Sequence, residues 1–317
     1  MKKYGKLVFG CALAVAVYVL VMAAVKMGLL SRQMMSLIIP VCMNIILAVS
    51  LCMVVGFLGE LSLGHAAFMS IGAYSGALVL KSGLPIVAAL PLAVVTGGIC
   101  AALLGLVVGI PVLRLRGDYL AIVTLAFGEI IKSIFNAATP VTGGAGGLKK
   151  VPLVTTYQNF TFVYVLMLIV IVLVSNLVNS RHGRAICTIR DNYIAAEAIG
   201  IRVSFYKTMA FVIAAFMAGT AGVVYAGNIG ILKPVNFDYN TSIEILVMVV
   251  LGGMGNIGGS IVAAFLLTIL PEMLRGLSGY RMLVYAIVLI AMMLFNNSPL
   301  KHMLVEKHNM RRAGRLQ

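Results

Sequence analysis

The sequence predicts an all-α polytopic membrane protein, a fold class supported by its composition, its long apolar runs and its charge distribution. Of the 317 residues, 62% are hydrophobic and 10% are charged, whereas a soluble domain carries about 25% charged residues. Several uninterrupted apolar runs reach the length of about 17–25 residues that a helix needs to cross a bilayer. Because these runs do not alternate in polarity, they favour helices over membrane strands. The composition excludes a soluble enzyme, a secreted disulfide scaffold and a disordered chain.

About ten spans are expected, in a single transmembrane domain that covers residues 1–317. They lie near 7–25, 34–56, 62–80, 86–110, 119–136, 160–179, 208–227, 241–254, 258–274 and 281–296. Lysines at positions 2, 3 and 6 precede the first run, as in a secretory signal. However, Leu7–Val25 is longer than the apolar region of such a signal, which has about 7–15 residues. A retained first span is therefore expected.

The net charge of +15 is explained by topology and does not require nucleic-acid binding. With the N-terminus inside, most basic residues fall in the N-terminal segment, the loop after residue 110, the loop 180–207 and the basic tail 297–317. Basic residues in short flanking loops set the orientation of membrane proteins, so both termini are expected in the cytoplasm. Treating 241–274 as one span would move the tail outside and remove this bias.

The chain lacks the parts of an enzyme. Neither a G-x-x-x-x-G-K-[ST] phosphate loop nor a G-x-S-x-G nucleophile elbow occurs. The five cysteines show no metal-ligand spacing, and no i, i+4 pair occurs among His65, His182, His302 and His308. We expect no catalysis, metal or cofactor, and we interpret the cysteines as small hydrophobic residues.

Two glycine-rich stretches, 56–65 and 251–260, interrupt the apolar pattern, one in each half of the chain. Irregular backbone at membrane depth is tolerated only where protein or a water-filled cavity surrounds it, and glycine-broken segments in both halves indicate a transport pathway. The alternative is that they are tight loops or close helix contacts, as expected for Gly72 and Gly76. The candidate pathway residues in these stretches are Gly59, Glu60, Ser62, Gly64, His65, Gly252, Gly253 and Asn256.

Glu129 and Glu244 join the candidate pathway residues. An ionisable group within a span costs about 2.5–3.5 kcal/mol on insertion scales, so its default interpretation is functional. Lys132 lies one helical turn from Glu129, and a structural ion pair is an equal alternative there. Glu60, His65 and Glu244 could instead lie at a membrane face, where water or a partner subunit satisfies them.

The loop 180–207 is charged and helical in pattern, unlike the rest of the chain. Asp191 or Asn192 can cap a short helix over 193–199, and Gly200 suits the left-handed residue that ends it. Such a helix is too short to be stable alone in water, so it either lies on the membrane face or docks on a cytoplasmic partner. The candidate coupling residues are Asp191, Asn192, Tyr193, Ala195, Ala196, Glu197 and Gly200.

The segments 59–68, 114–127 and 242–253, together with the loop 183–201, carry a family resemblance. Between about Leu51 and Leu274 the chain resembles the LivM branch of branched-chain amino acid ABC importer permeases. The resemblance places the ATPase-facing helix on 192–201, with Glu197 and Gly200 at motif positions, and an outer Thr-Gly-Gly segment on 142–144. The continuation 145–147 lacks the polar residue that relatives commonly place before the last glycine.

This resemblance implies a permease subunit of the bacterial inner membrane that pairs with a LivH-type permease. Two cytoplasmic ATPases would supply the energy, and a periplasmic binding protein would deliver Leu, Ile, Val or a related solute. ATP binding would then move the short inner helix and rock the transmembrane bundle.

Two other classes remain open from the residues alone. An ion-coupled secondary transporter would use Glu129 as its coupling site and need no ATPase. A membrane scaffold or receptor subunit would have no water-accessible path past Gly59–His65.

Overall fold

The computed structural model describes residues 15–27, 31–115 and 117–274, and positions 283, 286, 287, 290 and 294 near the C-terminus. The described part contains helices and no β-strand; its one β-bridge joins Leu148 to Leu232. The start of the expected first span, most of the expected span 281–296 and the basic tail 297–317 lie outside the described residues.

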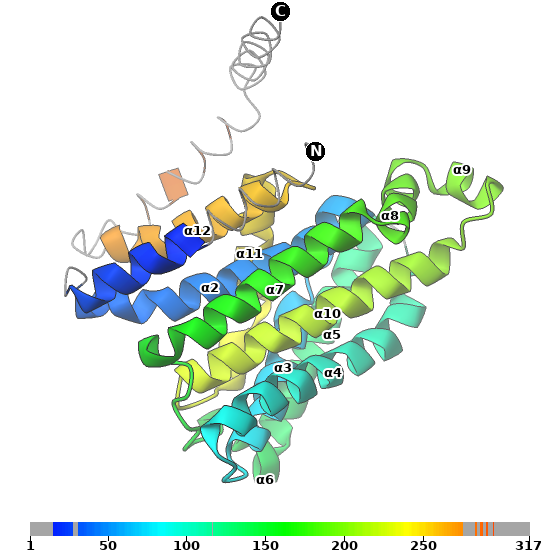
Figure 1. Cartoon of the computed structure of the whole chain (residues 1–317). Helices are drawn as coiled ribbons and strands as arrows, with labels where there is room; N and C mark the ends of the chain where they lie inside the picture. The colour runs from blue at the N-terminus through cyan, green and yellow to red at the C-terminus, as the bar shows by residue number, and fades with distance from the viewer. Residues whose placement is uncertain are drawn as a thin grey trace, which may run out of the picture.

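The helices follow one another along the chain, joined by short connections (Figure 1). They are Val15–Lys26, α2 (Arg32–Cys52), the π-helix η1 (Met53–Leu58), α3 (His65–Leu80), α4 (Ile86–Val112), α5 (Asp118–Ala137), α6 (Thr139–Thr142), η2 (Gly144–Gly146), η3 (Tyr157–Asn159), α7 (Phe160–Asn179), α8 (Arg181–Asp191), α9 (Tyr193–Ala198), α10 (Val203–Asn228), η4 (Pro234–Phe237), α11 (Tyr239–Gly252) and α12 (Ile257–Met273).

Five helical segments among the described residues are long and apolar enough to cross a bilayer. These are Arg32–Leu58, Ile86–Val112, Asp118–Ala137, Tyr157–Asn179 and Val203–Asn228. The expected count of ten is not confirmed. The expected span 62–80 becomes the 16-residue helix α3, because the polar run before His65 is not helical. At 1.5 Å per residue, α3 is about 24 Å long, shorter than a hydrocarbon core of about 30 Å.

Residues 239–273 form two helices and not one continuous span. The 14-residue helix α11 and the 17-residue helix α12 are separated by Gly253–Asn256, where Gly253 and Gly255 have φ of 90° and 81°. Asn256 caps α12 by accepting a hydrogen bond from the Gly259 N–H at 3.1 Å. The two helices pack tightly on each other, since a Cβ on Gly252 would lie 2.4 Å from the Ser260 nitrogen.

Small residues bring α3, α4 and α10 into close contact. Along α4 they recur every four residues and face α10 in antiparallel order, in the pairs Gly97–Val223, Ala101–Gly219, Gly105–Ala215 and Gly109–Phe211. A Cβ on Gly72 of α3 would lie 2.1 Å from the Gly219 carbonyl oxygen, and one on Gly76 would lie 2.6 Å from Val223. The expected helix contact at Gly72 and Gly76 is confirmed. Such small-residue stripes let helix backbones approach closely in membranes.

The bundle has two distinct ends. In Figure 1, α8 and α9 lie at one end of the long helices, and α6 lies at the opposite end. Helix α2 runs through the interior and packs antiparallel to α12, since Asn44 Nδ2 donates to Thr268 Oγ1 at 2.9 Å whereas Gly56, further along the chain, lies against Gly255. This arrangement brings the end of η1 and the break before α12 to the same place.

We predict that Gly72→Ala destabilises the protein by about 1–3 kcal/mol, because its methyl group must displace the α10 backbone. The matched control is Gly128→Ala in α5, where an added Cβ meets no atom within 4 Å. Since alanine is the better helix former, this control should be neutral or stabilising by up to about 1 kcal/mol. Thermal unfolding of the detergent-solubilised protein measures both. Equal unfolding midpoints for the two variants would contradict the packing described above.

Candidate functional site

The two glycine-rich stretches meet in the folded chain. A Cβ on Gly56, within η1, would lie 2.3 Å from the Gly255 nitrogen, so the two backbones are in direct contact. Only glycine at position 56 permits this approach. We call the cluster at this contact the glycine junction; it comprises Gly56, Gly59, Glu60, Arg190, Lys207 and Gly255.

Arg190 of α8 binds the end of the α2–η1 helix. Its Nη1 donates to the Gly56 carbonyl oxygen at 3.0 Å. The last carbonyl groups of a helix lack partners within the helix and carry partial negative charge, so a cation stabilises them. The stem of Arg190 passes over Gly59, where a Cβ would lie 2.5 Å from its Cγ and where φ is 78°. The glycine at position 59 therefore provides both the left-handed turn and the room for the arginine.

Glu60 forms an ion pair with Lys207 of α10, and both side chains are largely buried, with 12% and 10% of their surface exposed. Two buried charges are tolerated only as a pair, because each alone would carry its full desolvation cost. The pair fastens the end of η1 to α10. Glu60 is thus paired within the chain, whereas the sequence alone also allowed water or a partner subunit as its neighbour.

The segment between Glu60 and α3 is held by hydrogen bonds to three other helices. The Leu63 N–H donates to Thr124 Oγ1 of α5 at 3.0 Å, and the Ala66 N–H donates to Ser242 Oγ of α11 at 3.1 Å. His65 is buried and its Nε2 lies 2.7 Å from Ser50 Oγ of α2. These bonds fix the entrance to α3.

The serine hydroxyl groups around this segment differ in whether they have a hydrogen-bond partner. Ser50 Oγ lies 2.8 Å from the Leu47 carbonyl oxygen and 2.7 Å from His65 Nε2, so both the hydroxyl and the ring nitrogen have a hydrogen-bond partner. By contrast, Ser62 Oγ is the buried side-chain polar atom without a hydrogen-bond partner in the described part of the chain. A Cβ on Gly64 would lie 2.7 Å from the Thr124 carbonyl oxygen, so this glycine permits the contact with α5.

Glu129 and Glu244 lie on α5 and α11. Glu129 Oε2 accepts from Lys132 Nζ at 3.2 Å, and 40% of its side-chain surface is exposed. The ion pair anticipated from the one-turn spacing is therefore present. Glu244 is exposed on α11, as is Ile243 next to it. These acidic side chains reach the surface of the chain, outside the glycine junction.

Asp238 caps α11 beside the same surface. Its Oδ1 accepts from the Thr241 N–H at 3.2 Å and from Thr241 Oγ1 at 3.3 Å, and its Oδ2 accepts from Asn240 Nδ2 at 2.9 Å. Burial tends to raise the pKa of this carboxyl group, but these hydrogen bonds and the charge of Lys132 hold the pKa below its usual value. The stabilisation from this cap is present above the ordinary carboxyl pKa and is lost only as the pH falls through the lowered one.

Helix α9 forms as the sequence predicts. Asn192 is its N-cap, with Oδ1 accepting from the Ile194 and Ala195 N–H groups at 3.0 and 3.1 Å, and Gly200 has a left-handed φ of 84°. Asp191 is instead the last residue of α8. Within α9 only Ala196 is buried; Glu197 and the large apolar side chain of Ile194 are exposed. Tyr193, at the start of α9, is half-buried and packs against the core, so α9 is attached through Tyr193 and Ala196 and exposes its other side chains.

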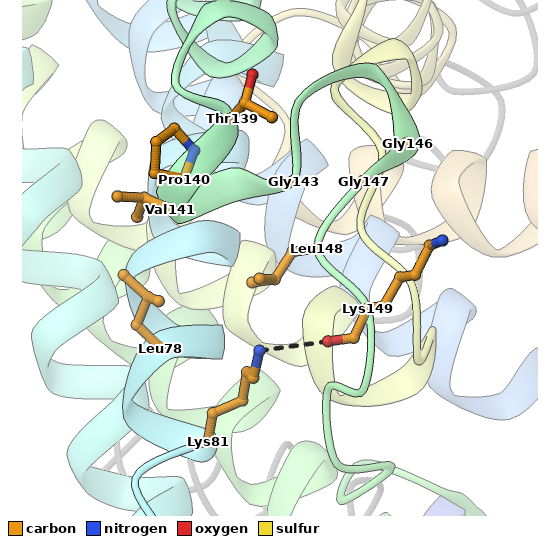
Figure 2. Close-up of a pocket in the computed structure, with 10 residues that line it drawn as sticks. All are labelled: Leu78, Lys81, Thr139, Pro140, Val141, Gly143, Gly146, Gly147, Leu148 and Lys149. Atoms are coloured by element: carbon orange, nitrogen blue, oxygen red, sulfur yellow. Dashed lines mark hydrogen bonds between the residues drawn. The ribbon is translucent and has the colours of Figure 1, made fainter.

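A cavity of about 670 Å³ lies at the end of the bundle opposite α8 and α9. Figure 2 shows its walls, which come from α6, from the glycine-rich loop after it and from the end of α3. Lys81 Nζ donates to the Lys149 carbonyl oxygen across one side at 3.3 Å. The walls include these two lysines and no acidic side chain, and none of the candidate pathway residues.

Comparison with known proteins decides the family. The family profile described as "Branched-chain amino acid transport system / permease component" matches residues 33–295. The chain belongs to this permease family. It is 35% identical to the high-affinity branched-chain amino acid transport system permease protein LivM of Escherichia coli (strain K12), over 88% of this chain and 72% of that protein. The LivM protein of Salmonella typhimurium is also 35% identical, over 87% and 72%.

A more distant relative is the autoinducer 2 import system permease protein LsrC of Yersinia pseudotuberculosis, which is 25% identical over 65% of this chain and 61% of its own. No solved structure matches the chain. The chain is thus a LivM-type permease subunit of an ABC importer, a multi-pass inner-membrane transport protein and not an enzyme. Membership of this permease family implies ATPase and further permease subunits.

Sequence reasoning missed part of the glycine junction in this LivM-type permease. It selected Gly59 and Glu60 but not Gly56, Gly255, Arg190 and Lys207. The signal for Lys207 was available, since it is a lysine at the start of the long apolar run 208–227. Its partner 147 residues away follows only from the fold.

We predict that Glu60→Gln destabilises this permease by about 3–5 kcal/mol, because Lys207 is left buried and unpaired. The double variant Glu60→Gln/Lys207→Gln should recover part of that loss. Lys132→Gln is the control, since it removes one partner of the more exposed pair and should cost at most about 1 kcal/mol. Unfolding midpoints in detergent measure all three. A double variant less stable than Glu60→Gln would contradict the assigned pairing.

Proposed function

We propose that this chain and a LivH-type permease together form the translocation pathway of an ABC importer for branched-chain or related amino acids. A periplasmic binding protein delivers the solute, two cytoplasmic ATPases supply the energy and one of them docks on α8–α9, and both termini of the chain, a single permease domain, lie in the cytoplasm. The observation that carries this proposal is that both glycine breaks meet beside α8, whose continuation α9 is exposed. The substrate class rests on the names of the LivM relatives.

The exposed face of α9 supports the docking of an ATPase. Ile194 and Ile199 are 63% and 72% exposed, on either side of the exposed Glu197. Apolar side chains beside a carboxylate suit a protein partner, which can cover the former and pair with the latter. The position of α8 and α9 at the end of the bundle leaves room for such a partner (Figure 1).

The surface of α5 and α11 supports a pathway shared with a second permease. The exposed faces of α4 and α7 are apolar, with Leu103, Val107 and Ile169 among their members, as expected for contact with lipid. By contrast, the exposed faces of α5 and α11 carry Glu129 and Glu244 among apolar side chains such as Ile130 and Ile243. Placing these carboxylates in lipid would be costly, so a partner subunit and an aqueous path are the better neighbours.

The glycine-broken segments supply the polar part of this pathway. The segment 60–64 leads into α3 and contacts α5 through Thr124, and the first turn of α3 contacts α11 through Ser242. The unpaired Ser62 hydroxyl adds spare hydrogen-bonding capacity there. We assign the pathway role to the segment 59–65, to Glu129 and Glu244, and to the break 252–256.

The coupling role of α9 predicts that Gly200→Ala reduces solute-stimulated ATP hydrolysis by the assembled importer about tenfold. Alanine at a left-handed φ costs about 1–3 kcal/mol of strain, which would displace the end of α9. Gly83→Ala is the matched control, because Gly83 has a similar φ of 78° and equally open surroundings next to α3. Glu197→Gln should act like Gly200→Ala. Unchanged hydrolysis in both α9 variants, with normal membrane insertion, would remove α9 from the mechanism.

The pathway role of α5 predicts that a cysteine at Ala126 reacts with a membrane-impermeant thiol reagent in the assembled importer, since thiolates form only in contact with water. Ala126 is exposed on α5, one turn before Glu129. Leu103→Cys on the apolar face of α4 is the control and should stay unlabelled in the same Cys-free background. Equal protection at both positions would show that no aqueous path passes Ala126 and would contradict the proposed pathway.

A further inference from the structure

We propose that Arg190 is the positioning residue that transmits movement of α8–α9 to both glycine breaks at once. The inference rests on the proposed function, because it takes α8–α9 to be the segment that the ATPases move. Arg190 is the side chain that joins this segment to the transmembrane helices.

The first contact of Arg190 is with the end of the α2–η1 helix. The guanidinium donates to the Gly56 carbonyl oxygen at 3.0 Å, in the last turn of a 27-residue helical segment. The Gly56 carbonyl group has no partner within the helix to replace Arg190, so breaking this bond is costly. When α8 moves, η1 is therefore expected to move with it. A displacement of Arg190 is thus passed to the longest buried helix of the bundle.

The second break, before α12, lies against the first. The backbone of Gly255 touches Gly56, the residue to which Arg190 donates, and a Cβ built on Gly255 would lie 3.6 Å from Arg190 Nη1. One guanidinium therefore binds the first break and lies beside the second, at the point where the two breaks touch each other. A residue that merely capped η1 would not need to lie beside the second break.

Asp191 fixes the guanidinium to α8. Its Oδ1 accepts from Arg190 Nε at 3.0 Å and from Nη2 at 2.9 Å, which leaves Nη1 for Gly56. The next residue, Asn192, caps α9. The end of α8, the arginine and the start of α9 are thus connected within three consecutive residues, and the planar fork of arginine serves both partners at once.

The chain should fold without Arg190, because the end of η1 has a second attachment. Glu60 and Lys207 hold it to α10 through their buried ion pair. Arg190→Ala is therefore expected to loosen the connection to α8 without detaching η1 from the bundle. Arg190→Lys retains the charge at the helix end but not the planar fork, and it should restore coupling in part.

Spin-label distances in the complete importer, measured nucleotide-free and with ATP, test this inference. In a background with all five cysteines replaced, one label at Val107 on α4 serves as the reference. A second label is placed either at Ile194 on α9 or at Met254 in the break, all three sites being exposed. The variants are Arg190→Ala, Arg190→Lys and, as the matched control, Arg184→Ala, which removes an exposed arginine of the same helix.

In the unsubstituted importer and in Arg184→Ala, we expect ATP to shift both distances. In Arg190→Ala, the Ile194 distance should still shift while the Met254 distance does not, and solute uptake should fall about tenfold with ATP hydrolysis retained. Arg190→Lys should recover part of the Met254 shift. Shifts at both sites in Arg190→Ala would overturn the role of Arg190 and leave the proposed function intact. The Ile194-labelled importer is used only where it retains ATP hydrolysis, and an Ile194 label that does not respond to ATP in such an importer would overturn the proposed function itself, and the inference with it.

Discussion

The end of the α2–η1 helix imposes the constraint on which the rest of the structure depends. A long apolar helix that stops inside a protein leaves carbonyl groups without partners, and in apolar surroundings each such group is costly. Here Arg190 satisfies one of them and the Glu60–Lys207 pair fastens the same end to α10. Both cations come from the segment that runs from α8 to α10, so the exposed α9 helix is tied to the centre of the bundle at each of its ends.

The surface of the chain has apolar and charged regions, and the cost of leaving a polar group in apolar surroundings decides which neighbour each region needs. Where it is apolar, as on α4 and α7, lipid is a sufficient neighbour. Where it carries Glu129 and Glu244, the chain requires water or another protein. The proposed pairing with a second permease would resolve this, since the polar face would become part of an internal path when the second subunit covers it. Close glycine contacts among α3, α4 and α10 keep the remaining core compact.

Local patterns in the sequence were sufficient for the features that depend on neighbouring residues. The cap at Asn192, the left-handed Gly200 and the pairing of Glu129 with Lys132 all lie within a turn or two of chain and were anticipated. The contact of Gly56 with Gly255 and the partner of Lys207 bring together distant segments, so no periodicity reveals them. Length and hydropathy likewise predicted too long a helix at α3, because they cannot show where the helix begins after a polar segment.

The central claim is that this permease is a conduit whose energy comes from separate ATPase subunits. Reconstitution in proteoliposomes with its partner permease, with and without the ATPases, and with binding protein and solute on the outer side, tests it most directly. We expect solute to accumulate against its gradient only when the ATPases and ATP are present inside. Uphill accumulation without them, driven by an ion gradient alone, would contradict the claim.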